Sequence, residues 1–134
     1  MVNKNIMSDE VSASGPYSHA IDAGDYIFFS GQTPMNSADY KEGQPKENIA
    51  EQTKKALANL ESVMRAADVT REEVVKVNVY LTTMNHFKEM NEIYADFFNA
   101  PYPARTCVAV YELPLGADVE IEVIVKKSSN QSNR

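Results

Sequence analysis

The 134-residue chain has a single cysteine, Cys107, and no tryptophan. One cysteine rules out a disulfide within the chain and makes a cysteine-ligated metal site untenable. It also fits a reducing compartment, in which thiols stay free. Glycine is scarce as well, with five in the whole chain, and the sequence contains no glycine-rich phosphate-binding loop. These absences exclude disulfide-stapled, cysteine-metal and P-loop proteins.

Positive charge is also in short supply. The chain has 13 Lys and Arg residues against 19 Asp and Glu residues, which gives a formal net charge of -6 and a pI of about 4.9. The densest basic pairs are Lys54-Lys55 and Lys126-Lys127, and no basic stripe joins them. Nucleic acid and anionic membranes attract clustered cations. We therefore expect neither to be the main partner.

Long apolar segments are absent too. No run approaches the roughly 20 residues that a membrane-spanning helix needs. Residues 1–7 lack the apolar core of a signal peptide and the arginine-rich pattern of a transit peptide, so we expect a cytoplasmic protein without a membrane partner. The length suits one domain. We place it at residues 15–127, between a loosely held N-terminal arm at 1–14 and a flexible C-terminal tail at 128–134.

Hydrophobic periodicity predicts strands and helices in alternation along this domain. The predicted elements begin with strands at 17–21 and 26–32 and a helix at 47–67. Thr70 and Glu73 match a capping box, which predicts a brief helical turn before a strand at 74–81. A second helix that Asn85 caps and that runs through Asn99 follows, and the last two strands begin near 104 and 119. This order favours an α+β fold in which two helices pack on one face of a mixed β-sheet.

The last two strands carry the most informative charges. Alternation places Arg105 and Cys107 on one side of the first strand, opposite a β-branched row that includes Thr106 and Val108. Glu120 alternates in the same way with the apolar residues of the final strand. If the β-branched rows face the core, Arg105 and Glu120 both point away from it, toward a sheet face that no helix covers. A half-apolar open face implies association, so we expect a homo-oligomer.

Each of these charges has two interpretations. Arg105 is either a strand-edge arginine paired with a surface carboxylate or a two-point clamp for the carboxylate of a substrate. Glu120 and Glu122 are either solvent-facing strand residues or groups that orient a water molecule. An arginine nearby would lower the pKa of such a glutamate, so the hypothesis favours orienting water over strong proton abstraction.

Five further positions offer polar groups or a thiol. Tyr17 follows a Gly-Pro turn and is either a core residue or a presented hydroxyl. Ser30 and Gly31 end a strand, where they either turn a corner or offer a hydroxyl and an N–H to a ligand. Asn91 is by default a solvated helix residue. Cys107 is interpreted as a small buried residue whose backbone matters more than its sulfur. No His/Glu spacing supports a metal site, and no cofactor is expected.

Several fragments taken together resemble one family. They are Gly15-Pro16-Tyr17-Ser18, Ser30-Gly31-Gln32-Thr33-Pro34, Val74-Val75-Lys76-Val77-Asn78-Val79-Tyr80, Asn91-Glu92-Ile93-Tyr94, Pro103-Ala104-Arg105-Thr106-Cys107-Val108 and Val119-Glu120-Ile121-Glu122. In this order, over roughly residues 12–127, they are similar to the RidA (YjgF) family of reactive-intermediate deaminases. The sequence departs from the family pattern at Tyr111-Glu112, where a small and then a basic residue are common.

The resemblance implies a chorismate-mutase-like fold and a homotrimer with sites in the clefts between subunits. It implies hydrolysis of 2-imino acids, such as 2-iminobutanoate and 2-iminopropanoate, to 2-oxo acids and ammonia without a cofactor. These imines come from the enamine products of pyridoxal-phosphate dehydratases, so the implied role is metabolite damage control. Arg105 would hold the substrate carboxylate and Glu120 the attacking water, with Tyr17 as a third catalytic residue. The substrate-binding positions would be Ser30, Gly31, Asn91 and Cys107.

Two other functions remain open at this point. The same pocket in a non-catalytic trimer would bind 2-oxo acids for regulation. An RNA-directed inhibitor of translation is less favoured, because the chain is acidic and shows no basic groove.

Overall fold

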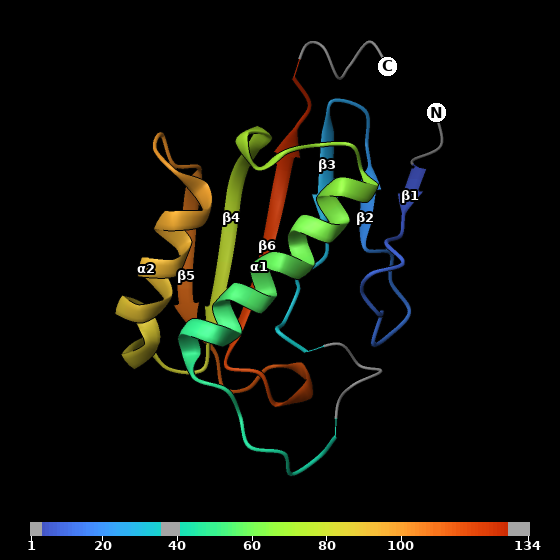
Figure 1. The fold of residues 1–134 in the computed structure, drawn as a ribbon. Helices are drawn as coiled ribbons and strands as arrows, with labels where there is room; N and C mark the ends of the chain where they lie inside the picture. Colours follow the sequence, from blue (N-terminus) through green and yellow to red (C-terminus); the bar gives the residue numbers. More distant parts are fainter. Residues whose placement is uncertain (1–3, 36–40, 129–134) are drawn as a thin grey trace.

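The computed structural model describes residues 4–35 and 41–128. Within this part of the chain, six strands form one sheet in the order β1-β2-β3-β6-β4-β5 (Figure 1). The strands are β1 (Lys4–Ile6), β2 (Ala20–Asp22), β3 (Tyr26–Phe29), β4 (Val74–Leu81), β5 (Ala104–Ala109) and β6 (Val119–Lys126). The helices are α1 (Ile49–Ala66) and α2 (Phe87–Phe98), with short 3-10 turns at Arg71–Glu73, Met84–His86 and Pro114–Gly116.

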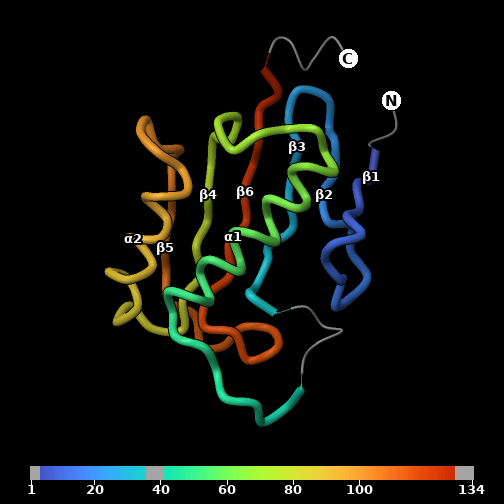
Figure 2. Tube along the Cα trace, in the orientation of Figure 1, coloured from blue at the N-terminus to red at the C-terminus, as the bar shows by residue number. Residues whose placement is uncertain are grey.

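The sheet is mixed, and both helices cover one of its faces. β4 and β5 run parallel, whereas the other neighbouring strands are antiparallel. In Figure 2 both helices cross in front of the sheet, with α2 over β5 and α1 over the central strands. None of the helices within the described ranges is long and apolar enough to span a membrane. The predicted α+β class and the one-sided helical layer are therefore confirmed.

The core lies between α1 and the central strands. Helix α1 begins after Asn48, whose side chain accepts a hydrogen bond from the backbone N–H of Glu51 at 2.9 Å. Its apolar stripe includes Leu57, Leu60 and Val63, which are at most 2% exposed. Fully burying each such side chain stabilises the fold by roughly 1.5–3 kcal/mol, so the predicted helical stripe accounts for much of the core.

The expected loose arm is wrong for residues 4–14. β1 pairs antiparallel with β2, and Val11 is buried in the core. The backbone N–H of Ser8 donates to Nδ1 of the buried His19 at 2.9 Å. β1 is a short edge strand with polar residues, so its sequence carries no apolar alternation that would reveal it. Residues 1–3 of the predicted arm, and 129–134 of the predicted tail, lie outside the described residues.

The predicted faces of β5 are reversed. Arg105 pairs in register with Val77, which is fully buried beneath the helices, so Arg105 and Cys107 lie on the helix side of the sheet. Val108 lies on the open face and is 42% exposed. Glu120 pairs with Tyr80 on that same open face. The prediction that Arg105 and Glu120 share one face is therefore wrong, because β-branched residues suit a strand on either side and do not identify the core.

Candidate active site

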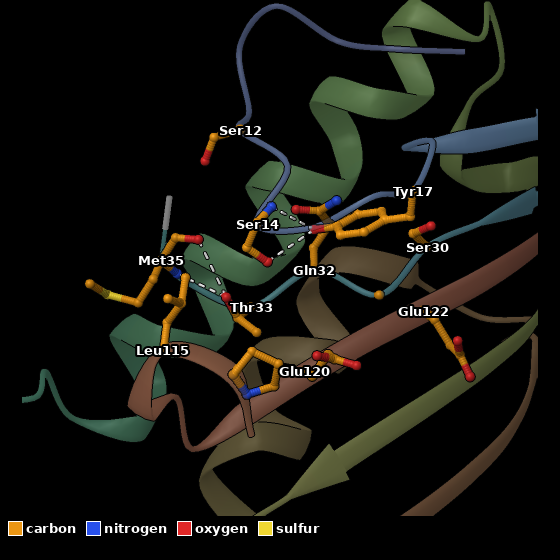
Figure 3. Close-up of a pocket in the computed structure, with 12 residues that line it drawn as sticks. Ser12, Ser14, Tyr17, Ser30, Gln32, Thr33, Met35, Leu115, Glu120 and Glu122 are labelled. Carbon is orange, nitrogen blue, oxygen red and sulfur yellow. Dashed lines mark hydrogen bonds between the residues drawn. The ribbon is translucent and has the colours of Figure 1, made fainter. Parts of the chain in front are cut away.

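A cavity of about 320 Å³ opens beside the start of β6 (Figure 3). Its walls come from the segment before β2, the end of β3, the 3-10 turn at Pro114–Gly116 and the first residues of β6. Four residues singled out in the sequence line it together: Tyr17, Ser30, Gly31 and Glu120. Segments that lie more than a hundred residues apart thus form one polar pocket.

Gly31 and Glu120 are in direct contact. A Cβ atom added to Gly31 would lie 2.6 Å from Oε2 of Glu120 and 2.9 Å from its Cδ. Glycine is needed at this position for space and not for backbone conformation, because the φ of Gly31 lies outside the left-handed region. Reciprocal backbone hydrogen bonds of 2.9 and 3.0 Å between Gln32 and Ile121 hold the two segments together. Glycine at position 31 therefore lets the carboxylate rest against the chain.

The hydroxyls of Tyr17 and Ser30 differ in the hydrogen bonds that they make within the chain. Tyr17 is 40% exposed, and its hydroxyl accepts a hydrogen bond from the backbone N–H of Ser14 at 3.2 Å. The same hydroxyl lies 3.4 Å from Oγ of Ser14, and either oxygen can be the donor in this contact. When Ser14 donates, the Tyr17 proton is left for a ligand, as the presented-hydroxyl interpretation requires. Ser30 donates its hydroxyl proton to the carbonyl of Ser18 at 2.6 Å. Ser30 is thus left as an acceptor on the cavity wall.

The environment of Glu120 makes it a stronger base than an ordinary glutamate. Burial raises the pKa of its carboxyl, and the neighbouring Glu122 raises it further. Glu122 itself accepts hydrogen bonds from Asn78 Nδ2 at 3.0 Å and from the Tyr80 hydroxyl at 2.5 Å. This contact raises the pKa of Tyr80 to about 12. The expectation of a lowered glutamate pKa is wrong for the single chain, because the arginine that would lower it lies across the sheet.

Arg105 belongs to a second cluster, on the helix side of the sheet. Its Nη1 donates to Oδ1 of Asn91 at 2.7 Å. Its guanidinium carbon lies 4.7 Å from the ring centroid of Tyr94 and 5.5 Å from that of Phe87, distances typical of cation–π contacts. Asn91 is therefore not the solvated residue of the default interpretation.

Cys107 follows Arg105 on the same row of β5 and is half-buried. Burial raises the pKa of its thiol, and the Arg105 charge opposes this only in part. A protonated thiol is a poor nucleophile. This environment supports the interpretation that the backbone, and not the sulfur, is the useful part of Cys107.

The predicted site residues thus form two groups within one chain. Tyr17, Ser30, Gly31 and Glu120 share the cavity, whereas Arg105, Asn91 and Cys107 do not line it. No group of His, Cys, Asp and Glu residues in the described ranges is arranged to hold a metal ion.

Several residues of both groups were not predicted from the sequence to belong to the site. Gln32 and Leu115 line the cavity, and Nε2 of the buried Gln32 has no hydrogen-bond partner among the described residues. Phe87 and Tyr94 flank Arg105. A signal for these two existed, because positions 87, 91 and 94 follow the spacing that puts residues on one face of a helix.

An acidic hub fixes the wall formed by the turn at Pro114–Gly116. Asp118 accepts hydrogen bonds from Thr82 Oγ1 at 2.9 Å, from Gln52 Nε2 at 3.1 Å and from Lys46 Nζ at 3.2 Å. Its backbone N–H donates to Oε1 of Gln52 at 2.9 Å. The start of β6, the end of β4 and the first turn of α1 are therefore tied together next to the cavity.

Two relatives are similar in sequence to this chain over most of their length. The RutC family protein y4sK of Sinorhizobium fredii is 41% identical over 125 residues, which is 93% of this chain and 98% of that protein. A protein of Dermatophagoides farinae named 2-iminobutanoate/2-iminopropanoate deaminase is 36% identical over 127 residues, again 93% of this chain and 98% of that protein.

Solved structures show the same fold. The YjgF gene product from E. coli and E. coli TdcF with bound serine each superpose with a TM-score of 0.82 at 32% identity, over 93% of this chain and 99% of theirs. Residues 7–127 match the family described as Endoribonuclease L-PSP. The chain therefore belongs to the Endoribonuclease L-PSP family, which also carries the names YjgF, RutC and RidA.

Proposed function

We propose that this protein hydrolyses 2-imino acids to 2-oxo acids and ammonia, at a site completed between two copies of the chain. The supporting observation is a pair of groups: a carboxylate of raised pKa, Glu120, and an oriented guanidinium, Arg105. They occur in a family with a relative named 2-iminobutanoate/2-iminopropanoate deaminase. A similar structure holds serine, an amino acid of the same size class as these substrates.

Arg105 supplies the carboxylate site in this proposal. Asn91 occupies Nη1, which leaves the Nη2–Nε edge for a two-point contact with a carboxylate. The imine carbon is already electrophilic, so the reaction needs position and a proton acceptor more than a covalent nucleophile.

Glu120 serves as the base. It takes a proton from a water molecule as the water oxygen bonds to the imine carbon, and the C=N double bond becomes a single bond in a carbinolamine. Glu120 returns that proton to nitrogen, which completes the carbinolamine. It then takes the carbinolamine hydroxyl proton and delivers it to nitrogen, so that the C–N bond breaks as the C=O bond forms, ammonia leaves and the 2-oxo acid remains. The Tyr17 hydroxyl donates a hydrogen bond to the same reacting group.

Arg105 and Glu120 lie on opposite faces of the sheet in one chain, so a second copy must supply one of them. The open face carries exposed apolar side chains that need cover, among them Tyr26, Phe28 and Val108 at 42–48% exposure. A ring of three copies with head-to-tail contacts would bring the Arg105 side of one chain to the Glu120 cavity of the next. We propose this homotrimer as the active, cytoplasmic form.

The reaction is tested by coupling to a pyridoxal-phosphate threonine dehydratase. 2-Oxobutanoate formation is followed in the presence of an amine that traps the imine, with and without this protein. We expect faster 2-oxobutanoate formation with the protein. Tight 2-oxobutanoate binding without any rate increase would instead indicate a regulatory 2-oxo-acid-binding protein.

The shared site is tested by mixing subunits. Arg105→Ala and Glu120→Ala chains, each inactive alone, are unfolded together and refolded as mixed assemblies. If each site takes one residue from each of two neighbours, about a quarter of the sites in a one-to-one mixture are complete. Light scattering gives the mass of the assemblies. A monomer mass, or no recovery of activity on mixing, would contradict the proposal.

A further inference from the structure

One face of α2 surrounds the Arg105 guanidinium. Phe87, Asn91 and Tyr94 stand four and three positions apart, so they project from α2 in a single row. All three contact Arg105: Asn91 through its amide oxygen, and Tyr94 and Phe87 through their rings. Figure 1 shows α2 lying over β5, the edge strand that carries Arg105.

The hydrogen-bond partner in this row is neutral. Surface arginines are commonly paired with a carboxylate, as Arg65 is with Glu10. Arg105 instead donates to an amide oxygen at 2.7 Å. An amide fixes the direction of the guanidinium plane without cancelling its charge. The full positive charge stays available to a second acceptor.

The Tyr94 ring packs against the face of the guanidinium and, like the Asn91 amide, does not cancel its charge. Its side chain is 5% exposed, and its ring centroid lies 4.7 Å from the guanidinium carbon. Its hydroxyl is buried and has no hydrogen-bond partner among the described residues. Burial raises the pKa of Tyr94 to about 12; the Arg105 charge opposes this in part, and Cys107 adds a smaller increase. The ring therefore stays uncharged at neutral pH.

We propose that Asn91 and Tyr94 are positioning residues for Arg105: they fix its edge and its face while leaving its charge unpaired for an anionic carboxylate. This proposal rests on the carboxylate-binding part of the proposed function. It also changes the role expected of Asn91, which then acts through Arg105 and not by touching the substrate.

Substitutions at Asn91 separate positioning from ordinary structural support. Asn91→Ala removes the acceptor, and we expect the dissociation constant of 2-oxobutanoate and the KM for the imine to rise about tenfold with kcat little changed. Asn91→Asp keeps an acceptor and strengthens the bond to Arg105, but it neutralises the guanidinium. We expect it to weaken 2-oxobutanoate binding more than Asn91→Ala does, by about a hundredfold, with unchanged or higher thermal stability.

Substitutions at Tyr94 provide a matched pair. Tyr94→Phe keeps the ring and removes only the unpartnered hydroxyl, so binding should stay within about twofold of wild type. Tyr94→Leu removes the aromatic face at similar burial and should weaken binding about fivefold to tenfold. The Nε–Hε NMR resonance of Arg105, assigned with Arg105→Lys, should shift and broaden in Asn91→Ala and Tyr94→Leu but not in Tyr94→Phe.

The outcomes distinguish this inference from the proposed reaction. If 2-oxobutanoate binds but no imine is hydrolysed, the proposed reaction is wrong. The positioning role is still tested in that case, by the order of 2-oxobutanoate affinities among the Asn91 and Tyr94 variants. Asn91→Asp binding 2-oxobutanoate better than Asn91→Ala would overturn the inference, because a structural hydrogen bond alone predicts that order. An unchanged Arg105 resonance in Asn91→Ala and Tyr94→Leu, or no 2-oxobutanoate binding by wild type, would overturn it as well.

Discussion

Replacing Gly31 by alanine tests how closely the geometry of Glu120 governs the proposed reaction. The added Cβ would lie 2.6 Å from Glu120 Oε2, whereas ordinary contact begins at 3.4 Å. The carboxylate must therefore move by about 0.8 Å, and a misplacement near 1 Å lowers a rate by roughly a hundredfold. This corresponds to about 2.7 kcal/mol of lost transition-state stabilisation.

The same substitution should leave the fold intact. The contacting atoms belong to the free end of a side chain, and Gly31 has no unusual φ. Replacing glycine by alanine at such a position is neutral or stabilises by about 0.4–1 kcal/mol, because the unfolded chain loses freedom. We therefore expect an unchanged or slightly higher melting temperature together with the hundredfold loss of imine hydrolysis.

Two measurements make the test specific. Gly15→Ala is the matched control, since its Cβ would meet the Tyr17 ring at an ordinary 3.7 Å, and it should keep normal activity. NMR titration of the Glu120 carboxyl in Gly31→Ala should show its pKa falling toward the ordinary value, because the displaced carboxylate regains water. Normal hydrolysis by Gly31→Ala, or a rate loss with an unchanged Glu120 titration, would refute the reasoning.

Three further predictions concern Arg105, Cys107 and Glu120. Arg105→Lys keeps the charge but loses the planar fork, and with it one hydrogen bond to the substrate carboxylate. Hydrogen bonds to charged groups are worth roughly 1.5–3 kcal/mol, so imine hydrolysis should fall about tenfold to a hundredfold. Near-normal hydrolysis by Arg105→Ala would disprove the carboxylate clamp. Cys107→Ala and Cys107→Ser should keep most hydrolysis, because burial raises the thiol pKa and keeps it protonated; complete loss in a folded alanine variant would point to thiol catalysis. The raised pKa of Glu120 stabilises the fold below the ordinary glutamate pKa, and this contribution is lost as pH rises through the raised value. Glu120→Gln should therefore abolish hydrolysis. Its melting temperature should exceed that of wild type by a margin that grows as pH rises toward neutral. Identical melting temperatures across that pH range would contradict the raised pKa of Glu120.

The regular parts of the fold were predictable because their patterns are strict. In β6 the residues from Val119 to Val125 alternate between buried and half-buried positions, as the sequence indicates. The stripe of α1 and the capping pair of Thr70 and Glu73 were also predicted, and Oε1 of Glu73 accepts from the Thr70 N–H at 3.0 Å. The second helix begins at Phe87, two residues after the predicted cap Asn85, because Thr83 caps a 3-10 turn that comes first.

The candidate site was predictable only in part. Tyr17, Gly31 and Glu120, which the motifs group together, line one cavity. They do not reveal the face on which Arg105 lies, since that depends on its pairing with β4 and on the room beneath α2. Tyr94 fits the apolar stripe of α2 and is buried as that stripe requires. Its second contact, with Arg105, is a tertiary feature that helical periodicity alone does not encode.

Because Arg105 and Glu120 lie on two faces of the sheet, the specific activity should depend on protein concentration. Under the proposed reaction, a lone folded chain carries two half-sites and no complete one. Specific activity is then set by mass action, and it falls when the protein is diluted below the dissociation constant of its assembly. The steepness of that fall reports how many chains must meet, so a dilution series gives the stoichiometry of the working unit.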